Sequence, residues 1–146
     1  MTQSPSTSVP AIDWMLAQTR LTLPPRPKAT DLDALFARGA LIVDIRPVGL
    51  RQRDGELAGA VVIDRNQLEW RLDPTSPNRI AEVTGHDQEI VLMCDEGYAS
   101  SLAAATLQRL GLHQATDLDG GYQAIRRAQA HRTPANAASR SQTPAW

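Results

Sequence analysis

Residues 89–105 read EIVLMCDEGYASSLAAA, an apolar run followed by a turn and a segment rich in Ala. The run at 90–93 contains β-branched residues and predicts a buried strand, whereas the segment from Leu102 onward predicts a helix. The single cysteine, Cys94, therefore lies where the strand ends. Ligands of open α/β sheets bind at this edge, so we interpret Cys94 as a candidate site residue rather than as a core thiol.

The turn at 95–100 can surround a charged sulfur. Gly97 permits a sharp change of direction, and Ser100 or Ser101 is expected to cap the following helix. Several backbone N–H groups of such a loop can point at the sulfur of Cys94, and the positive end of the helix dipole adds to them. This setting favours the thiolate, which is the nucleophilic form of cysteine.

Two carboxylates in the same turn oppose this effect. Asp95 and Glu96 follow Cys94 directly. A like charge about 4 Å from the sulfur costs about 1 kcal/mol even in water. An exposed helix N-terminus contributes about 0.3–1 kcal/mol in the other direction. Because the two effects are similar in size, the directions of these two side chains decide whether Cys94 is a good nucleophile.

Length and composition indicate one α/β domain. The chain has 146 residues, enough for one well-packed domain but short for two. Its net charge is −1 with both signs interspersed, so no nucleic-acid surface is expected. One cysteine excludes an internal disulfide and a cysteine-built zinc site, and the three histidines have no metal-ligand spacing. We expect no metal and no cofactor. The abundance of Ala and Arg suggests a bacterial source.

The ends of the chain differ in composition from its centre. We predict an N-terminal leader at 1–27 with a short helix at 12–19, a domain at 28–129 and a flexible tail at 130–146. The N-terminus lacks the basic start and apolar core of a signal peptide, and no apolar run is long enough to cross a membrane. We therefore expect a soluble cytoplasmic protein with no membrane partner.

Within the domain, apolar runs alternate with helical patterns. Strands are predicted at 40–45, 60–63, 89–93 and, more weakly, 115–118. Helices are predicted from a cap at Thr30 or Asp31 to Gly39, and at 66–72, 80–83, 101–110 and 122–129. Trp70 is expected to pack in the interior. The alternation predicts an α/β fold with a central parallel sheet flanked by helices on both faces.

A second group of polar residues follows the first predicted strand. Asp44 and Arg46 lie at its carboxyl end, at the same edge as Cys94. We interpret Asp44 as structural support, in an ion pair or a loop anchor. Arg46 is a candidate substrate-binding residue, because a guanidinium can bind an anionic substrate. The same role is open to Arg51, Arg53 and Arg65.

Five motifs in order resemble a single rhodanese domain over about residues 28–129. They are DIRP at 44–47, GELAGA at 55–60, DP at 73–74, CDEGYAS at 94–100 and LDGGYQA at 118–124. The resemblance implies a rhodanese-like fold with a five-stranded parallel sheet. It also implies an enzyme, a sulfurtransferase that transfers sulfur-containing groups.

The resemblance assigns the catalytic role to Cys94, which would carry the transferred sulfur as a persulfide. The backbone amides that would cradle this persulfide belong to Asp95, Glu96, Gly97, Tyr98, Ala99, Ser100 and Ser101. The implied donors are a small thiosulfonate such as thiosulfate, 3-mercaptopyruvate or a persulfide. The acceptor would be an external thiol or cyanide, because the chain has no second cysteine; a protein persulfide partner is a further option.

Departures from the family pattern leave other functions open. Ala99 stands where the family often has a loop arginine; together with Asp95 and Glu96, this favours a protein persulfide or an uncharged donor over a small dianion. One alternative is a non-catalytic module that binds a protein partner or small ligand. Another is a cysteine phosphatase, although Ser100 occupies the arginine position of the C-x5-R pattern.

Overall fold

The computed structural model describes residues 8–131. Its centre is a sheet of four parallel strands in the order β2-β1-β3-β4. The strands are β1 (Leu41–Asp44), β2 (Val61–Val62), β3 (Ile90–Met93) and β4 (Ala115–Asp117). All four lie within or at the predicted runs. The prediction of an α/β fold with a central parallel sheet is thus confirmed.

The implied fifth strand is absent from the sheet of the described residues 8–131. The Pro-rich segment at 24–27 runs beside β4 instead. Thr116 Oγ1 donates to the Pro24 carbonyl at 3.2 Å, and the Asp119 N–H donates to the Pro27 carbonyl at 2.8 Å. Three of the four residues in this segment are prolines, which have no N–H to donate to a strand ladder. The edge of β4 is covered without a strand.

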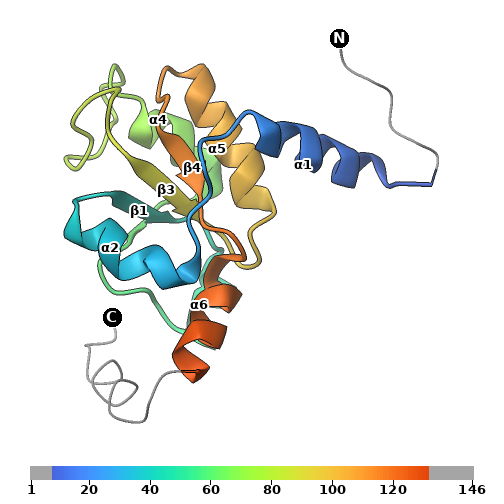
Figure 1. The fold of residues 1–146 in the computed structure, drawn as a ribbon. Coiled ribbons are helices and arrows are strands. Elements are labelled where there is room, and N and C mark those ends of the chain that lie inside the picture. Colours follow the sequence, from blue (N-terminus) through green and yellow to red (C-terminus); the bar gives the residue numbers. More distant parts are fainter. Residues whose placement is uncertain (1–7, 132–146) are drawn as a thin grey trace.

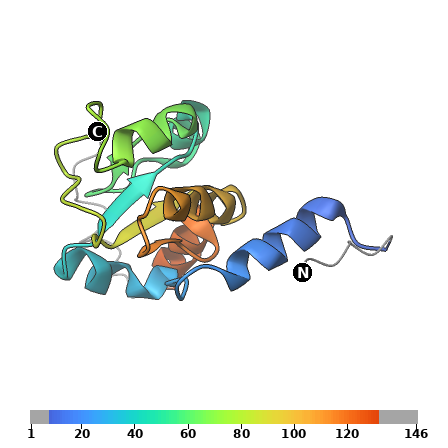
Figure 2. The ribbon, with the colours of Figure 1, turned by 90° about the horizontal axis from the view of Figure 1, so that it is seen from above.

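Helices cover both faces of the sheet (Figures 1 and 2). The α-helices are α1 (Ala11–Leu21), α2 (Leu32–Ala37), α3 (Val48–Asp54), α4 (Leu68–Leu72), α5 (Ala99–Arg109) and α6 (Gly121–Ala130). Two 3-10 turns, η1 (Ala29–Asp31) and η2 (Arg65–Gln67), precede α2 and α4.

The strands bury side chains on both faces, as expected for a central parallel sheet. Val43, Ile90 and Leu92 belong to the core that includes α4 and α5. Ile42 and Val91 belong to the opposite core, with α2 and α6. This alternation follows from the two-residue period of a strand. The parallel direction of the strands places the carboxyl ends of β1, β3 and β4 at one edge of the sheet.

Two local predictions were wrong, and one helix was missed. Residues 80–83 form a turn rather than a helix; only Ile80 is buried there, and four residues are too few to nucleate a helix. Helix α3 was not predicted, because its sequence VGLRQRD buries none of its residues and has no apolar period. Helix α5 begins at Ala99, so Ser100 and Ser101 lie in its first turn and do not cap it.

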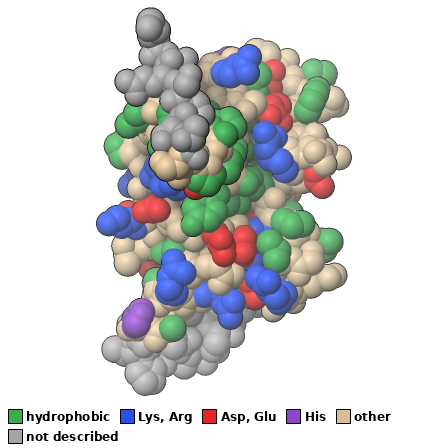
Figure 3. All heavy atoms as spheres, turned by 90° about the vertical axis from the view of Figure 1, so that its right-hand side faces the viewer, with side chains coloured by type: hydrophobic (Ala, Val, Ile, Leu, Met, Phe, Trp, Pro, Cys, Tyr) green, Lys and Arg blue, Asp and Glu red, His purple; other side chains and the backbone are tan. Residues whose placement is uncertain are grey.

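The helix predicted near the N-terminus is present and longer than expected. Helix α1 packs against α5 and extends away from the sheet (Figures 1 and 2). The face that carries α1 has hydrophobic side chains near its middle, with acidic and basic side chains around them (Figure 3). Most of the predicted leader before its helix and most of the predicted tail at 130–146 lie outside the described residues. No helix within 8–131 is long and apolar enough to cross a membrane.

Candidate active site

Cys94 lies directly after β3 and is 8% exposed. The Gly97 N–H donates to its Sγ at 3.1 Å, and the Ser100 N–H does so at 3.4 Å. The Cys94 thiol in turn donates to Ser100 Oγ at 3.1 Å. The strand delivers the sulfur to the sheet edge, and the tight turn brings the start of α5 back over it. This arrangement surrounds the sulfur with hydrogen-bond donors that stabilise negative charge.

A buried carboxylate fixes the first turn of α5. Asp117, the last residue of β4, is fully buried. Its Oδ2 accepts hydrogen bonds from Ser100 Oγ at 2.6 Å and Ser101 Oγ at 2.8 Å. Arg26 Nε donates to Oδ1 at 2.7 Å. The guanidinium thus compensates the buried charge, and the two hydroxyls connect that pair to the turn around Cys94.

Asp117 and Arg26 were missed from the sequence. Asp117 ends a weak apolar run, and its position at the carboxyl end of a strand was the available signal. Burial acts to lower the pKa of the Arg26 guanidinium, but hydrogen bonding and attraction to Asp117, with smaller contributions from Asp119 and Cys94, raise the pKa overall. Arg26 is therefore a permanent positive charge beside the site.

The two loop carboxylates have different environments. Asp95 Oδ1 accepts a hydrogen bond from Gln123 Nε2 at 2.9 Å and lies 3.9 Å from the Arg53 guanidinium. Glu96 is exposed. A nearby cation offsets the charge of Asp95, and solvent screens that of Glu96. Both side chains line the cavity beside Cys94, with the charge of Asp95 partly offset by Arg53 and that of Glu96 open to solvent.

A cavity of about 410 Å³ opens beside Cys94. Apolar side chains, including Ile45, Pro47 and Leu50, form much of its wall. Arg65 and Glu96 also line it. A small sulfur donor or the end of a peptide chain fits a space of this size and mixed character.

The candidate guanidiniums are already paired with protein groups. Arg46 Nη2 lies 2.8 Å from Asp44 Oδ2 in an ion pair with both side chains fully buried, and it also donates to the Gly55 carbonyl at 2.9 Å. The Arg46 guanidinium carbon lies 3.7 Å from the centre of the Tyr122 ring. Arg46 lines the cavity, so a substrate-binding role stays a prediction, whereas the structure shows an anchor between β1 and the loop after it.

The other three candidate arginines also form ion pairs, and they differ in whether they line the cavity beside Cys94. Arg51 pairs with Glu56, Arg53 with Asp54 and Arg65 with Glu69, at 2.6, 2.7 and 2.9 Å. The bond from Arg53 lowers the pKa of Asp54 to about 2, with Gln123 and Arg126 contributing to the same shift and burial opposing it. Of these three, Arg65 lines the cavity beside Cys94. Among these three, it is the guanidinium placed to meet an anionic group in the cavity.

The tight turn depends on Gly97. Its φ of +86° lies in the left-handed region, and an added Cβ would lie 2.7 Å from the Gly120 nitrogen. The cysteine turn, residues 94–100, is therefore packed directly against the double-glycine turn, Gly120 and Gly121, at the start of α6. The carbonyl of Cys94 also accepts a hydrogen bond from the Tyr122 N–H at 2.9 Å.

We expect Gly97→Ala to reduce the stability of the fold. Gly39 is a matched control, because its φ is +84° and nothing lies within 4 Å of an added Cβ. Gly39→Ala carries only the backbone cost, about 1–2 kcal/mol, whereas Gly97→Ala adds a clash that costs about 1–3 kcal/mol. Denaturant unfolding of both variants measures the difference, and equal losses would contradict the close packing of the two turns.

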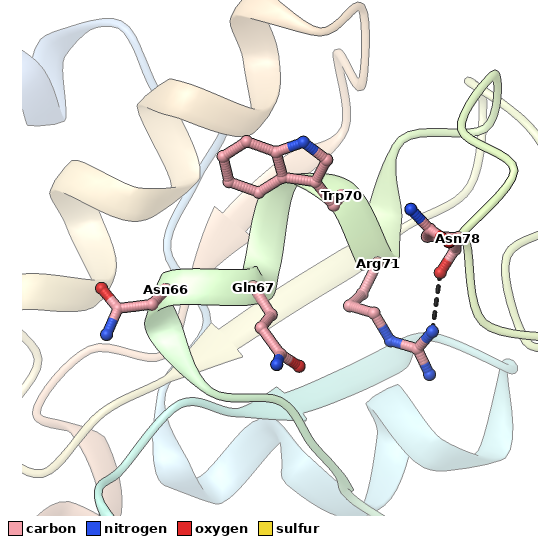
Figure 4. A pocket seen from close by; sticks show the side chains of 5 residues that line it. All are labelled: Asn66, Gln67, Trp70, Arg71 and Asn78. Atoms are coloured by element: carbon pink, nitrogen blue, oxygen red, sulfur yellow. Dashed lines mark hydrogen bonds between the residues drawn. The ribbon is translucent and has the colours of Figure 1, made fainter.

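A second hollow, of about 500 Å³, is lined in part by Trp70 (Figure 4). Trp70 is 61% exposed, so the prediction that it packs in the interior was wrong. Helix α4 buries Leu68 and Leu72 instead, which lie one turn apart on the same face. Arg71 Nη1 donates to the Asn78 carbonyl at 2.7 Å across this hollow. Cys94 does not line it.

Comparisons with known proteins agree with this geometry. The family model for the rhodanese-like domain matches residues 28–128. No curated protein matches the chain. A solved structure from Rhodopseudomonas palustris, described as a protein of unknown function and possible tyrosine phosphatase, is 32% identical; the alignment covers 86% of this chain and 96% of that one, with a TM-score of 0.72.

Two further solved structures are of rhodanese-related proteins. One, from Thermoplasma volcanium, is 22% identical, with 71% of this chain and 93% of that chain covered and a TM-score of 0.53. The other, a rhodanese homologue from Thermus thermophilus, is 26% identical, with 68% and 99% covered and a TM-score of 0.50.

Fold and site together define a parallel α/β domain with a cysteine turn at the carboxyl edge of its sheet. The match to the family model spans most of the chain, and the Rhodopseudomonas palustris structure is similar over nearly its whole length. The chain belongs to the rhodanese-like domain family.

Proposed function

We propose that this protein is a sulfurtransferase that carries sulfane sulfur on Cys94. The observation that supports the proposal most strongly is the convergence of the Gly97 and Ser100 N–H groups on the Cys94 sulfur. Those donors suit a thiolate before the reaction and a negatively charged persulfide after it. Such preorganised donors stabilise charge at the reacting atom without reorganisation.

The proposed reaction has two displacement steps. The Cys94 thiolate attacks the transferable sulfur of the donor; a new S–S bond forms, the donor's own bond to that sulfur breaks, and sulfite, a thiolate or, from 3-mercaptopyruvate, the pyruvate enolate leaves with the bonding electron pair. A thiolate or cyanide acceptor then attacks the outer sulfur of the Cys94 persulfide. This step restores the Cys94 thiolate, so the cycle needs no external oxidant or reductant. A cytoplasmic location, which keeps thiols reduced, is part of the proposal.

The residues around the cavity favour a persulfide or an uncharged donor over thiosulfate. Ala99 offers no guanidinium, and Glu96 places a negative charge at the cavity wall. Arg46 and Arg65 also line the cavity, but each is paired with a carboxylate, Asp44 and Glu69 respectively. A dianion therefore meets two paired cations and the two loop carboxylates, whereas an alkyl persulfide brings at most one negative charge to the apolar wall.

We expect Glu96→Gln to speed sulfur loading from thiosulfate about fivefold, because removing a like charge about 4 Å from an anion is worth about 1 kcal/mol in water. Loading from an alkyl persulfide should accelerate less, because this donor brings at most one negative charge. Glu82→Gln, at an exposed position outside the cavity, is the matched control. Equal acceleration with both donors would show that Glu96 does not select against anions.

A phosphatase is the competing catalytic function, since the Rhodopseudomonas palustris protein is described as a possible one. Ser100 fills the position at which a phosphatase of this pattern carries arginine, and its hydroxyl is bonded to Asp117. The site therefore offers no loop guanidinium for phosphoryl oxygens. A non-catalytic binding module is the other alternative.

A donor panel tests the proposal. Thiosulfate, 3-mercaptopyruvate and glutathione persulfide are each supplied with cyanide, and thiocyanate is measured; an aryl phosphate is tested in parallel. We expect thiocyanate from at least one sulfur donor and no phosphate release. Phosphate release without thiocyanate would replace the proposal with phosphatase chemistry, and neither product would favour the binding module.

A further inference from the structure

Two arginines that precede the matched rhodanese-like region donate hydrogen bonds to the cysteine turn. Arg20, in the last turn of α1, donates through Nη2 to the Gly97 carbonyl at 2.6 Å and through Nε to Ser101 Oγ at 3.1 Å. Arg26, in the connector after α1, donates through Nη2 to the same carbonyl at 3.0 Å. Both precede residue 28, where the family match begins. Two charged donors thus converge on one backbone oxygen.

Each guanidinium is itself held in place. The Arg20 guanidinium carbon lies 5.8 Å from the centre of the Tyr98 ring, within the range of a cation–π contact. Arg26 is fixed by its bonds to the buried Asp117. The two arginines are therefore ordered groups in a partly buried site, where charge-assisted hydrogen bonds are strong.

Anchoring this carbonyl sets the direction of the next N–H. The peptide between Gly97 and Tyr98 is trans, since no cis peptide occurs among the described residues. In a trans peptide the C=O and N–H point in opposite directions. With the Gly97 oxygen held by the arginines, the Tyr98 N–H faces the other way, and both Tyr98 and Cys94 line the cavity.

The amide set in this way is available to a ligand. Within residues 8–131, the N–H groups of Glu96 and Tyr98 make no hydrogen bond to a protein acceptor, whereas those of Gly97 and Ser100 bond the sulfur. A persulfide places a second sulfur beyond Sγ, where free donors of the same turn can meet it. The conformation of Gly97, whose φ is positive, determines whether the N–H groups of this turn all face one point.

We propose that Arg20 and Arg26 are positioning residues for the cysteine turn, so that α1 and the connector form part of the active site. They act through the Gly97 carbonyl and do not contact the sulfur. The inference rests on the proposed function only for sulfur loading, because the state of the Cys94 thiol can be measured without any donor.

The test compares four full-length variants with wild type. Arg20→Gln removes the guanidinium, Arg20→Lys keeps its charge, and Arg20→Gln combined with Arg26→Lys weakens both contacts while keeping a cation beside Asp117. Arg71→Gln is the matched control, because Arg71 also donates to a loop carbonyl but at the Trp70 hollow. Thermal unfolding confirms that each variant is folded.

Two readouts are recorded. The first is the ultraviolet absorbance of the Cys94 thiolate at neutral pH, which reports this residue alone because the chain has a single cysteine. The second is the rate of sulfur loading from an alkyl persulfide. For Arg20→Gln we expect lower thiolate absorbance and about threefold slower loading. The double variant should load about tenfold more slowly, which corresponds to about 1.4 kcal/mol, and Arg20→Lys should recover part of the loss.

The outcomes separate this inference from the proposed function. If thiolate absorbance falls in the Arg20 variants but wild type accepts no sulfur, the positioning role stands and the proposed function fails. If wild type loads sulfur and both readouts of Arg20→Gln and of the double variant match those of Arg71→Gln, the positioning role is overturned while the proposed function stands.

Discussion

Cys94→Ser is expected to reduce sulfur transfer at least about 1,000-fold while leaving the domain folded. A serine hydroxyl does not ionise at neutral pH and cannot form a persulfide, so both displacement steps lose their reacting atom. A factor of 1,000 corresponds to about 4 kcal/mol in the activation free energy. The side chain is nearly isosteric and Ser100 can bond the new hydroxyl, so we expect only a small change in stability.

Thiocyanate formation from the best donor measures this effect. Ser76→Ala is a useful comparison, because Ser76 is a buried serine that bonds the Asn78 N–H and does not line the cavity beside Cys94. We expect that variant to retain most of the activity. If Cys94→Ser keeps more than a few per cent of wild-type turnover, the reaction does not pass through a persulfide on this residue.

Arg46→Met is expected to have the largest effect on stability, lowering the free energy of unfolding by about 3–5 kcal/mol. The Asp44–Arg46 pair is fully buried, and removing the guanidinium leaves the Asp44 carboxylate without its counter-ion. The Gly55 carbonyl loses a donor as well. Methionine keeps much of the side-chain volume, so the loss reports charge and hydrogen bonding rather than a cavity.

Two further variants isolate the cause of that loss. Arg38→Met breaks an ion pair whose arginine side chain is 55% exposed, and it should cost no more than about 1 kcal/mol. Asp44→Asn combined with Arg46→Met removes both charges and should be more stable than Arg46→Met alone. Urea unfolding provides the comparison, and a loss below about 1 kcal/mol for Arg46→Met would contradict a structural role for the pair.

The sequence was sufficient for the parts of the fold that have strong apolar patterns. Strands β1 and β3 are continuous apolar runs, and the pattern of α6 was recognised to within one residue at either end. Helix α3 has no buried face, and the segment at 24–27 covers the sheet edge through side-chain and carbonyl contacts that no local pattern encodes.

The sequence pointed to the cysteine turn as a candidate site and to Asp44 as structural support, but it did not point to the three residues that bond that turn from a distance. Cys94 and Gly97 lie in one turn with a distinctive local sequence. Asp117, Arg26 and Arg20 reach that turn from far along the chain: Arg20 and Gly97 are 77 positions apart, and Arg26 and Asp117 are 91 apart. Such contacts arise only when parallel strands bring their carboxyl ends together and the N-terminal segment crosses the same edge.

Intact-mass spectrometry of the wild-type protein after incubation with a sulfur donor tests the central claim most directly. The account predicts that the wild-type mass rises by one sulfur atom, that cyanide reverses the gain, and that Cys94→Ser shows no gain under the same conditions. Two results would contradict a persulfide carried by Cys94. One is an unchanged wild-type mass after incubation with each of thiosulfate, 3-mercaptopyruvate and glutathione persulfide, and the other is an equal mass gain on Cys94→Ser.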